Sequence, residues 1–187
     1  MNQTSPRDLL KSVQSADLRQ CLVALSDAEE FDKRLSHASD ILKESILAQK
    51  ILEHTLLDPE FQALYGLAYK RTAIDKLWNR HDIFHAVTCV EYGATISRIL
   101  ATSRYWTQMD EYFVPTVVMS LLWHDIQRSF SQQHSVGIGW MARHLQEILQ
   151  VCSSENLIDT MDSMKLTGKS LSCIAEHNCE EKCSDLD

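Results

Sequence analysis

Apolar residues recur along most of the chain at the three- and four-residue spacing that is typical of amphipathic helices. The first such segment, residues 9–25, follows Ser5-Pro6, a helix N-cap with a first-turn proline. The second opens at the capping box Ser26-Asp27-Ala28-Glu29 and carries one broad apolar face from Phe31 to Leu52. We expect this face to pack inside the chain, and a partner helix in a homodimer is the alternative.

The same spacing predicts further helices along the rest of the chain. They start after Asp58-Pro59 and after Asp82, cover residues 111–125 with Pro115 in the first turn, start again at His134, and end with a short helix over 169–177. Ser153 or Ser154 is expected to cap the element after the His134 helix. The helix after Asp82 has two apolar faces, which predicts burial on more than one side; the second face consists of His85, Cys89, Tyr92, Ile96 and Ile99.

Turn-forming residues are scarce, with five Gly and three Pro in 187 residues. Strand-rich folds need many turns, so the scarcity predicts an all-α fold with long helices and short loops. The length suits one domain with a sizeable core. No Gly/Ser-rich linker interrupts the first 80 residues. We therefore expect residues 1–70 to be an N-terminal helical extension packed on a core domain formed by residues 71–187.

The net charge of -8, without a long basic run, argues against a broad nucleic-acid surface. No apolar stretch reaches membrane length, and the N-terminus lacks a signal pattern, so we expect a cytoplasmic protein with six reduced cysteines. Cys21, Cys89 and Cys152 are interpreted as small core residues. A zinc site built from His177 and the three C-terminal cysteines, Cys173, Cys179 and Cys183, is a weaker hypothesis because its spacing is atypical.

The candidate chemistry centres on His124-Asp125, at the end of the apolar run of residues 121–123. Imidazole and carboxylate together suit divalent first-row metals. Adjacent residues on a helix point about 100° apart, but at the last turn both side chains can reach one ion, or Asp125 can bridge two. His85, one turn inside an earlier helix, is on its own more typical of a structural core histidine. The other histidines, His37, His54, His81 and His144, are expected at the surface, at helix ends or beside the ligands.

The order His85, His124-Asp125, His134 and His177 resembles that of the HD-domain metal-dependent phosphohydrolases. Residues 79–87 (NRHDIFHAV) look like the family's first-histidine region, and residues 118–126 (VMSLLWHDI) look like its His-Asp helix. Residues 134–139 (HSVGIG) are similar to the His-x2-Gly segment that follows. The likeness covers about residues 75–180, and the combined pattern is more specific than His-Asp alone.

The resemblance implies an HD-type helical bundle in which His85, His124 and Asp125 bind metal. His134 and His177 would bind a second metal or contact phosphate, and Arg80 would hold a substrate phosphate by bidentate hydrogen bonds; a solvated surface arginine is the alternative. The implied cofactor is one or two divalent ions, with Mn, Fe, Mg, Zn, Co and Ni all open. The implied reaction is hydrolysis of a phosphate ester, a nucleotide included, by metal-activated water, with Asp125 and Arg80 in catalytic roles.

Two departures from the family pattern keep other functions open. Gln127 stands where many members have Gly. The family's final metal-ligand Asp lies well beyond the position that matches His177, and ten residues follow here. Either Asp185 or Asp187 replaces it, or the chain is truncated, or the site is incomplete. The alternatives are thus a degenerate HD domain that binds a nucleotide or a protein without turnover, and a purely structural bundle.

Overall fold

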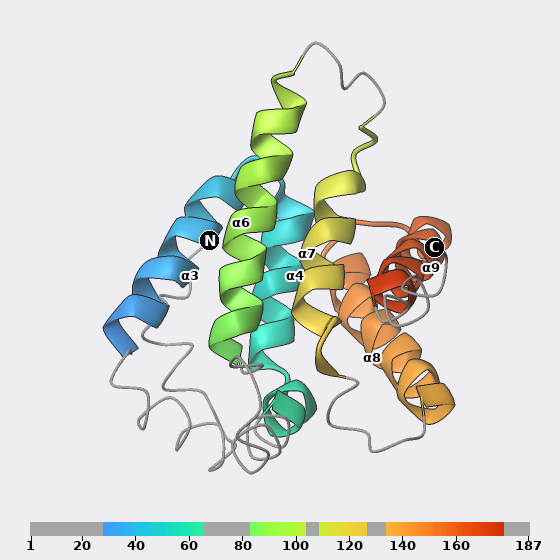
Figure 1. The fold of residues 1–187 in the computed structure, drawn as a ribbon. Helices are drawn as coiled ribbons and strands as arrows, with labels where there is room; N and C mark the ends of the chain where they lie inside the picture. The colour runs from blue at the N-terminus through green and yellow to red at the C-terminus, as the bar shows by residue number, and fades with distance from the viewer. Residues whose placement is uncertain (1–27, 66–82, 104–108, 127–133, 178–187) are drawn as a thin grey trace, which may run out of the picture.

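A computed structural model describes residues 28–65, 83–103, 109–126 and 134–177 (Figure 1), and their side chains except those of 28–29, 134–138 and 177. Of these residues 85% are helical, in seven helices, and none lies in a strand, which confirms the predicted all-α class. The helices are α3 (Ala28–Leu42), α4 (Ile46–Leu57), a helical segment over 59–65, α6 (Ile83–Ala101), α7 (Phe113–Trp123), α8 (His134–Ser154) and α9 (Thr160–His177). The HD-like arrangement stays a prediction.

The apolar face from Phe31 to Leu52, predicted on one helix, is divided between two. Helix α3 ends at Leu42 and α4 begins at Ile46, and in the turn between them Ser45 N–H donates to the Leu42 carbonyl at 2.8 Å. The turn allows α3 to pack on α6 while α4 packs on α7 and α8. The face is buried inside the chain in both helices, except at Ile46, the first residue of α4, which is 59% exposed. A homodimer through the N-terminal helices stays a prediction.

One hydrophobic core joins the helices, from Phe31 in α3 to Ile174 in α9. Helix α7 lies near its centre, in contact with α4, α6 and α9, and α8 packs on α4 and α9 (Figure 1). The fully buried Trp123, at the end of α7, contacts the rings of Phe61 and Trp140 at centroid distances of 5.1 and 5.6 Å. Because aromatic rings contribute large buried areas, this cluster fixes the end of α7 in the core. The proposed domain boundary after residue 70 lies outside the described residues.

Helix ends follow the sequence signals in one case and depart from them in another. Phe61 N–H donates to the Asp58 carboxylate at 2.7 Å, so the predicted cap at Asp58 is confirmed. The predicted cap at residues 153–154 is wrong, since these residues end α8, and Asp159 instead accepts a hydrogen bond from Asp162 N–H at 2.8 Å. Helix α9 therefore begins nine residues before the predicted 169–177 helix. Its buried positions include polar Thr167 and Ser170, which a hydrophobic pattern does not mark.

The two apolar faces of α6 have different environments. Ile83, Val87, Val90 and Ala94 on the first face are buried against the neighbouring helices, as predicted. Tyr92, Ile96 and Ile99 on the second face are each more than half exposed, so the predicted burial of this face is wrong. The physical reason is that α3 and α7 cover the other sides of α6. None of the helices in the described segments is long and apolar enough to cross a membrane.

Candidate metal centre

The antiparallel packing of α6 and α7 brings the predicted metal ligands together. His85 lies in the first turn of α6, and His124-Asp125 directly follows the last residue of α7. Because the two helices run in opposite directions side by side, the start of α6 lies beside the end of α7 (Figure 1). Residues 39 positions apart in the sequence thus meet at one end of the helix pair.

Three ligand atoms form a nearly equilateral triangle at this meeting point. The Nε2 atoms of His85 and His124 are 3.3 Å apart. Asp125 Oδ2 lies 3.2 Å from His85 Nε2 and 3.1 Å from His124 Nε2. An ion about 2.1 Å from all three atoms would see each pair at an angle of about 100°, between the tetrahedral and octahedral values. The three side chains therefore fit one face of a divalent-metal site and leave its remaining positions for other ligands.

Hydrogen bonds at the end of α7 orient this triangle. His124 Nδ1–H donates to the Leu121 carbonyl at 2.7 Å, which places the imidazole lone pair on Nε2. The Tyr65 hydroxyl donates to the Leu122 carbonyl at 2.5 Å. Both contacts satisfy carbonyls that a helix end leaves without intrahelical partners. The turn that carries His124 and Asp125 is therefore held before any ion binds.

Burial and charge make the triangle a site that requires a cation. Asp125 is 2% exposed and His124 is 7% exposed. The carboxylate of Asp125, with a smaller effect from Cys89, raises the pKa of His85 to about 10 against the opposing effect of burial. In the metal-free protein His85 is therefore protonated. Its proton lies among the three atoms of the triangle, whose lone pairs would otherwise face one another. A divalent ion at the same place would replace that proton.

Cys89 is a candidate ligand that the sequence interpretation missed. It lies one turn after His85 on α6, with Sγ 3.5 Å from His85 Nε2. One atom each of His85, Cys89 and His124 lies within 4.8 Å of the other two, so this group could hold a metal ion. The prediction that Cys89 is a core residue is wrong, whereas Cys152 is fully buried as predicted. The signal in the sequence was the spacing of four between His85 and Cys89, which places both on one helix face.

The other predicted site residues are described less completely. His134 is the first residue of α8 and His177 is the last residue of α9, as predicted, but their side chains lie outside the described part of the chain. Arg80, Asp185 and Asp187 lie outside it altogether. The structure therefore brings together His85, His124 and Asp125, and the second-metal and phosphate-contact roles stay predictions.

Two histidines expected to be peripheral have defined partners. His144 is 3% exposed, with its ring centroid 3.9 Å from that of Trp140 and its Nε2 2.8 Å from a Glu60 carboxylate oxygen. It is a core histidine, so the expectation of a surface or ligand-side position is wrong. His37 is exposed, as expected, and its Nδ1 lies 2.7 Å from Glu91 across the α3–α6 contact.

Comparisons with protein-family models, curated proteins and solved structures find no match to this chain. The family assignment therefore stays a prediction from the quoted motifs. The function has to be inferred from those motifs and from the geometry of the site itself.

Proposed function

We propose that this chain is a metal-dependent phosphohydrolase of the HD type that acts on a small phosphate ester. The observation that carries the proposal is the triangle of His85 Nε2, His124 Nε2 and Asp125 Oδ2, with sides of 3.1 to 3.3 Å. These are the residues that the resemblance to the HD family assigns to the metal. Two supports, the sequence motifs and the side-chain geometry, therefore agree on the same three ligands.

The donor set favours a first-row transition ion or zinc over magnesium. Two imidazole nitrogens and one carboxylate oxygen suit Mn, Fe, Co, Ni or Zn, whereas magnesium prefers oxygen ligands alone. The nearby sulfur of Cys89 adds a soft atom, which favours zinc within this group. The described ligands account for one ion, and a second would use His134 and His177.

Each ligand has a role that follows from its position. His85 and His124 are neutral donors, and Asp125 is the negatively charged one, so an ion held by all three keeps a net positive charge that attracts phosphate. When bound, the ion would polarise a phosphoryl oxygen and lower the pKa of the attacking water. Arg80 is proposed to hold the substrate phosphate by bidentate hydrogen bonds.

A degenerate HD domain that binds a nucleotide or a protein is the second candidate. Such a protein would bind metal through the same three side chains but would not turn over substrate.

The test is metal analysis of the purified protein, with phosphate release measured on the same sample from an aryl phosphate and a panel of nucleotides. We expect metal and release in the wild type and neither in His124→Ala. His37→Ala is the matched control, because the His37 side chain is 57% exposed and lies on α3, which carries none of the three proposed ligands. Bound metal without phosphate release from any of the substrates would favour the binding module. Absence of metal would contradict both candidates.

A further inference from the structure

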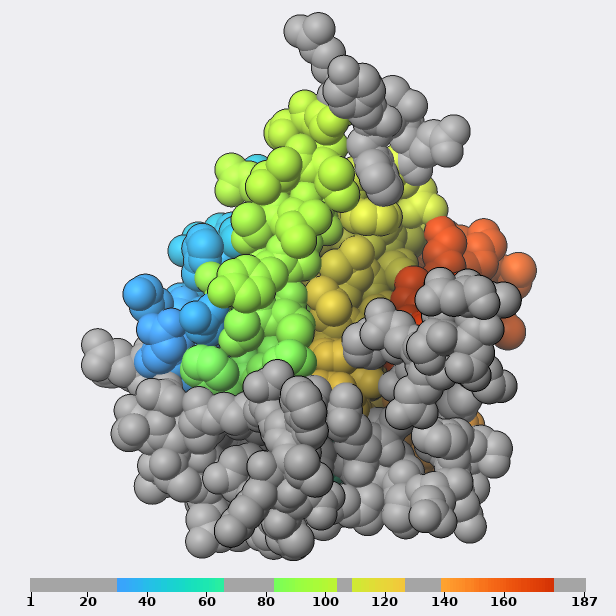
Figure 2. Space-filling view, viewed as in Figure 1, coloured from blue at the N-terminus to red at the C-terminus, as the bar shows by residue number. Residues whose placement is uncertain are grey.

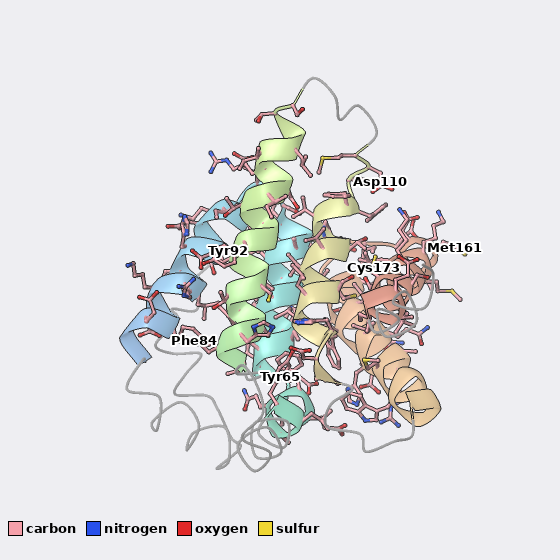
Figure 3. The ribbon with its side chains drawn as sticks, viewed as in Figure 1. Tyr65, Phe84, Tyr92, Asp110, Met161 and Cys173 are labelled. Carbon is pink, nitrogen blue, oxygen red and sulfur yellow. The ribbon has the colours of Figure 1, made fainter. Side chains whose placement is uncertain are left out.

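A groove of about 690 Å³ lies between α7 and α9. Phe113, Val117 and Leu121 line it from α7, and Ser172 and Cys173 line it from α9. Figure 2 shows α7 set back between α6 and α9, and Figure 3 shows Cys173 on the part of α9 that lies beside α7. The volume and the largely apolar lining with a few polar groups are typical of sites for small molecules.

The groove contains a buried hydroxyl without a partner. Ser120 lines the groove and is 8% exposed, and its Oγ has no hydrogen-bond partner among the described residues. Thr116, one turn earlier, differs because its hydroxyl donates to the Tyr112 carbonyl at 2.7 Å. A buried hydroxyl without a partner is destabilising. The Oγ atom itself is buried, so a polar group of a ligand in the groove would satisfy it after rotation of the Ser120 side chain toward the groove.

One face of α7 connects the groove to the metal centre. Phe113, Val117, Ser120 and Leu121 recur at the three- and four-residue spacing of one helix face, and His124 is the next position on it. His124 keeps helical backbone angles, with φ -58° and ψ -36°. Ser120 and His124 are four positions apart, which is about 6 Å along a helix axis. The groove-lining residues Ser120 and Leu121 are therefore within about one helical turn of His124 on the same face of α7.

The charge at the groove is already neutralised. Lys169 lies 2.6 Å from Asp110, and both residues line the groove. This pairing leaves the groove without a free cation among its described lining residues. A phosphate group in the groove would therefore have no free cation to pair with. An apolar group could leave water for the groove without losing a hydrogen bond.

We infer that the groove holds the non-reacting body of the substrate, and that the substrate is a small phosphate monoester with an apolar alkyl or aryl body. The body lies against Phe113, Val117 and Leu121, and one polar atom of it bonds Ser120. The phosphate lies at the end of the groove that faces His124. This inference rests on the proposed function, because it places the ester bond at the metal centre.

The first test measures binding of non-hydrolysable n-alkylphosphonates, from methyl to hexyl, to the zinc-loaded protein by calorimetry. We expect each added methylene to raise the affinity about fourfold until the groove is filled. Ser172→Trp fills the groove and should remove this chain-length dependence while methylphosphonate binding is unchanged. Met161→Trp is the matched control, since Met161 is 66% exposed on the same helix and does not line the groove.

The second test addresses Ser120 with a pair of phosphonates that differ by one hydroxyl on the alkyl chain. Ser120→Ala should weaken the hydroxylated member about threefold to tenfold and leave the other unchanged. Equal weakening of both members would overturn the role of Ser120. The proposed role of the groove would be overturned if phosphonate affinity did not depend on chain length in the wild type, or if both tryptophan variants lost this dependence.

The same measurements on the zinc-free protein distinguish failure of the groove inference from failure of the proposed function. Phosphonate affinity that depends on zinc but not on chain length would refute the groove and leave the phosphohydrolase. Affinity that depends on chain length but not on zinc would refute the phosphohydrolase and the placement of the phosphate. Dependence on both is the result that we expect.

Discussion

Metal binding at the triangle is expected to be coupled to the loss of a proton from His85. Asp125 is the largest cause that raises the pKa of His85 to about 10, so His85 is protonated in the metal-free protein at pH 7. An ion needs the lone pair on His85 Nε2, and the proton has to leave. Below the raised pKa, each pH unit should therefore strengthen binding about tenfold. Between pH 7 and pH 9 we expect a gain of about 100-fold in affinity, or about 2.7 kcal/mol.

The stability of the metal-free protein is expected to depend on pH in the opposite direction to its metal affinity. The folded-state pKa of His85 lies above its ordinary value of 6.5. Its contribution to the free energy of unfolding is therefore fully present below pH 6.5 and is lost as the pH rises through about 10. The metal-bound protein does not carry this proton. The stabilisation that the metal provides should accordingly increase with pH across this window.

The assay is competition with a chelator of known zinc affinity at pH 7, 8 and 9, with calorimetry in two buffers of different ionisation enthalpy to count the protons released. We expect close to one proton from His85 at pH 7. Asp125→Asn removes the main cause of the raised pKa, so this variant should bind zinc more weakly and release fewer protons. An affinity that stays constant between pH 7 and pH 9, without proton release, would refute the proposed coupling.

Three further predictions address the ligands and the helix ends that hold them. His124→Ala should abolish metal binding with an unchanged far-ultraviolet circular dichroism spectrum, because His124 follows α7; an unaltered metal content would contradict the site. Tyr65→Phe should lower the free energy of unfolding in urea by about 1–3 kcal/mol, because the buried Leu122 carbonyl loses its donor, and a change near zero would contradict this. Asp58→Ala should lower it by about 1 kcal/mol through loss of the Phe61 N-cap bond, while Asp58→Asn, which keeps an acceptor, should lower it much less.

Local signals allowed much of the fold to be predicted. The cap at Asp58, the start of α8 at His134 and the position of His124-Asp125 at the end of α7 were all readable from neighbouring residues. Such features depend on hydrogen bonds within a turn or two of the chain. The association of His85 with His124 and Asp125 is a contact between distant residues, and it was expected because of the motif order and not because of spacing.

Features that depend on what covers a side chain could not be predicted. An apolar face was correctly identified on α6 through Ile96 and Ile99, but periodicity does not say whether another helix lies on it. Cys89 was interpreted as a core residue because free cysteine usually behaves as a small hydrophobic residue. Buried polar residues such as Thr167 in α9 are invisible to a hydrophobic pattern, and the start of α9 was missed for this reason.

The most direct test of the metal centre is an anomalous difference map from a crystal of the protein grown with zinc. We expect one peak about 2.1 Å from each of His85 Nε2, His124 Nε2 and Asp125 Oδ2. A peak held by other residues, or no peak at the triangle in a crystal that contains zinc elsewhere, would contradict it.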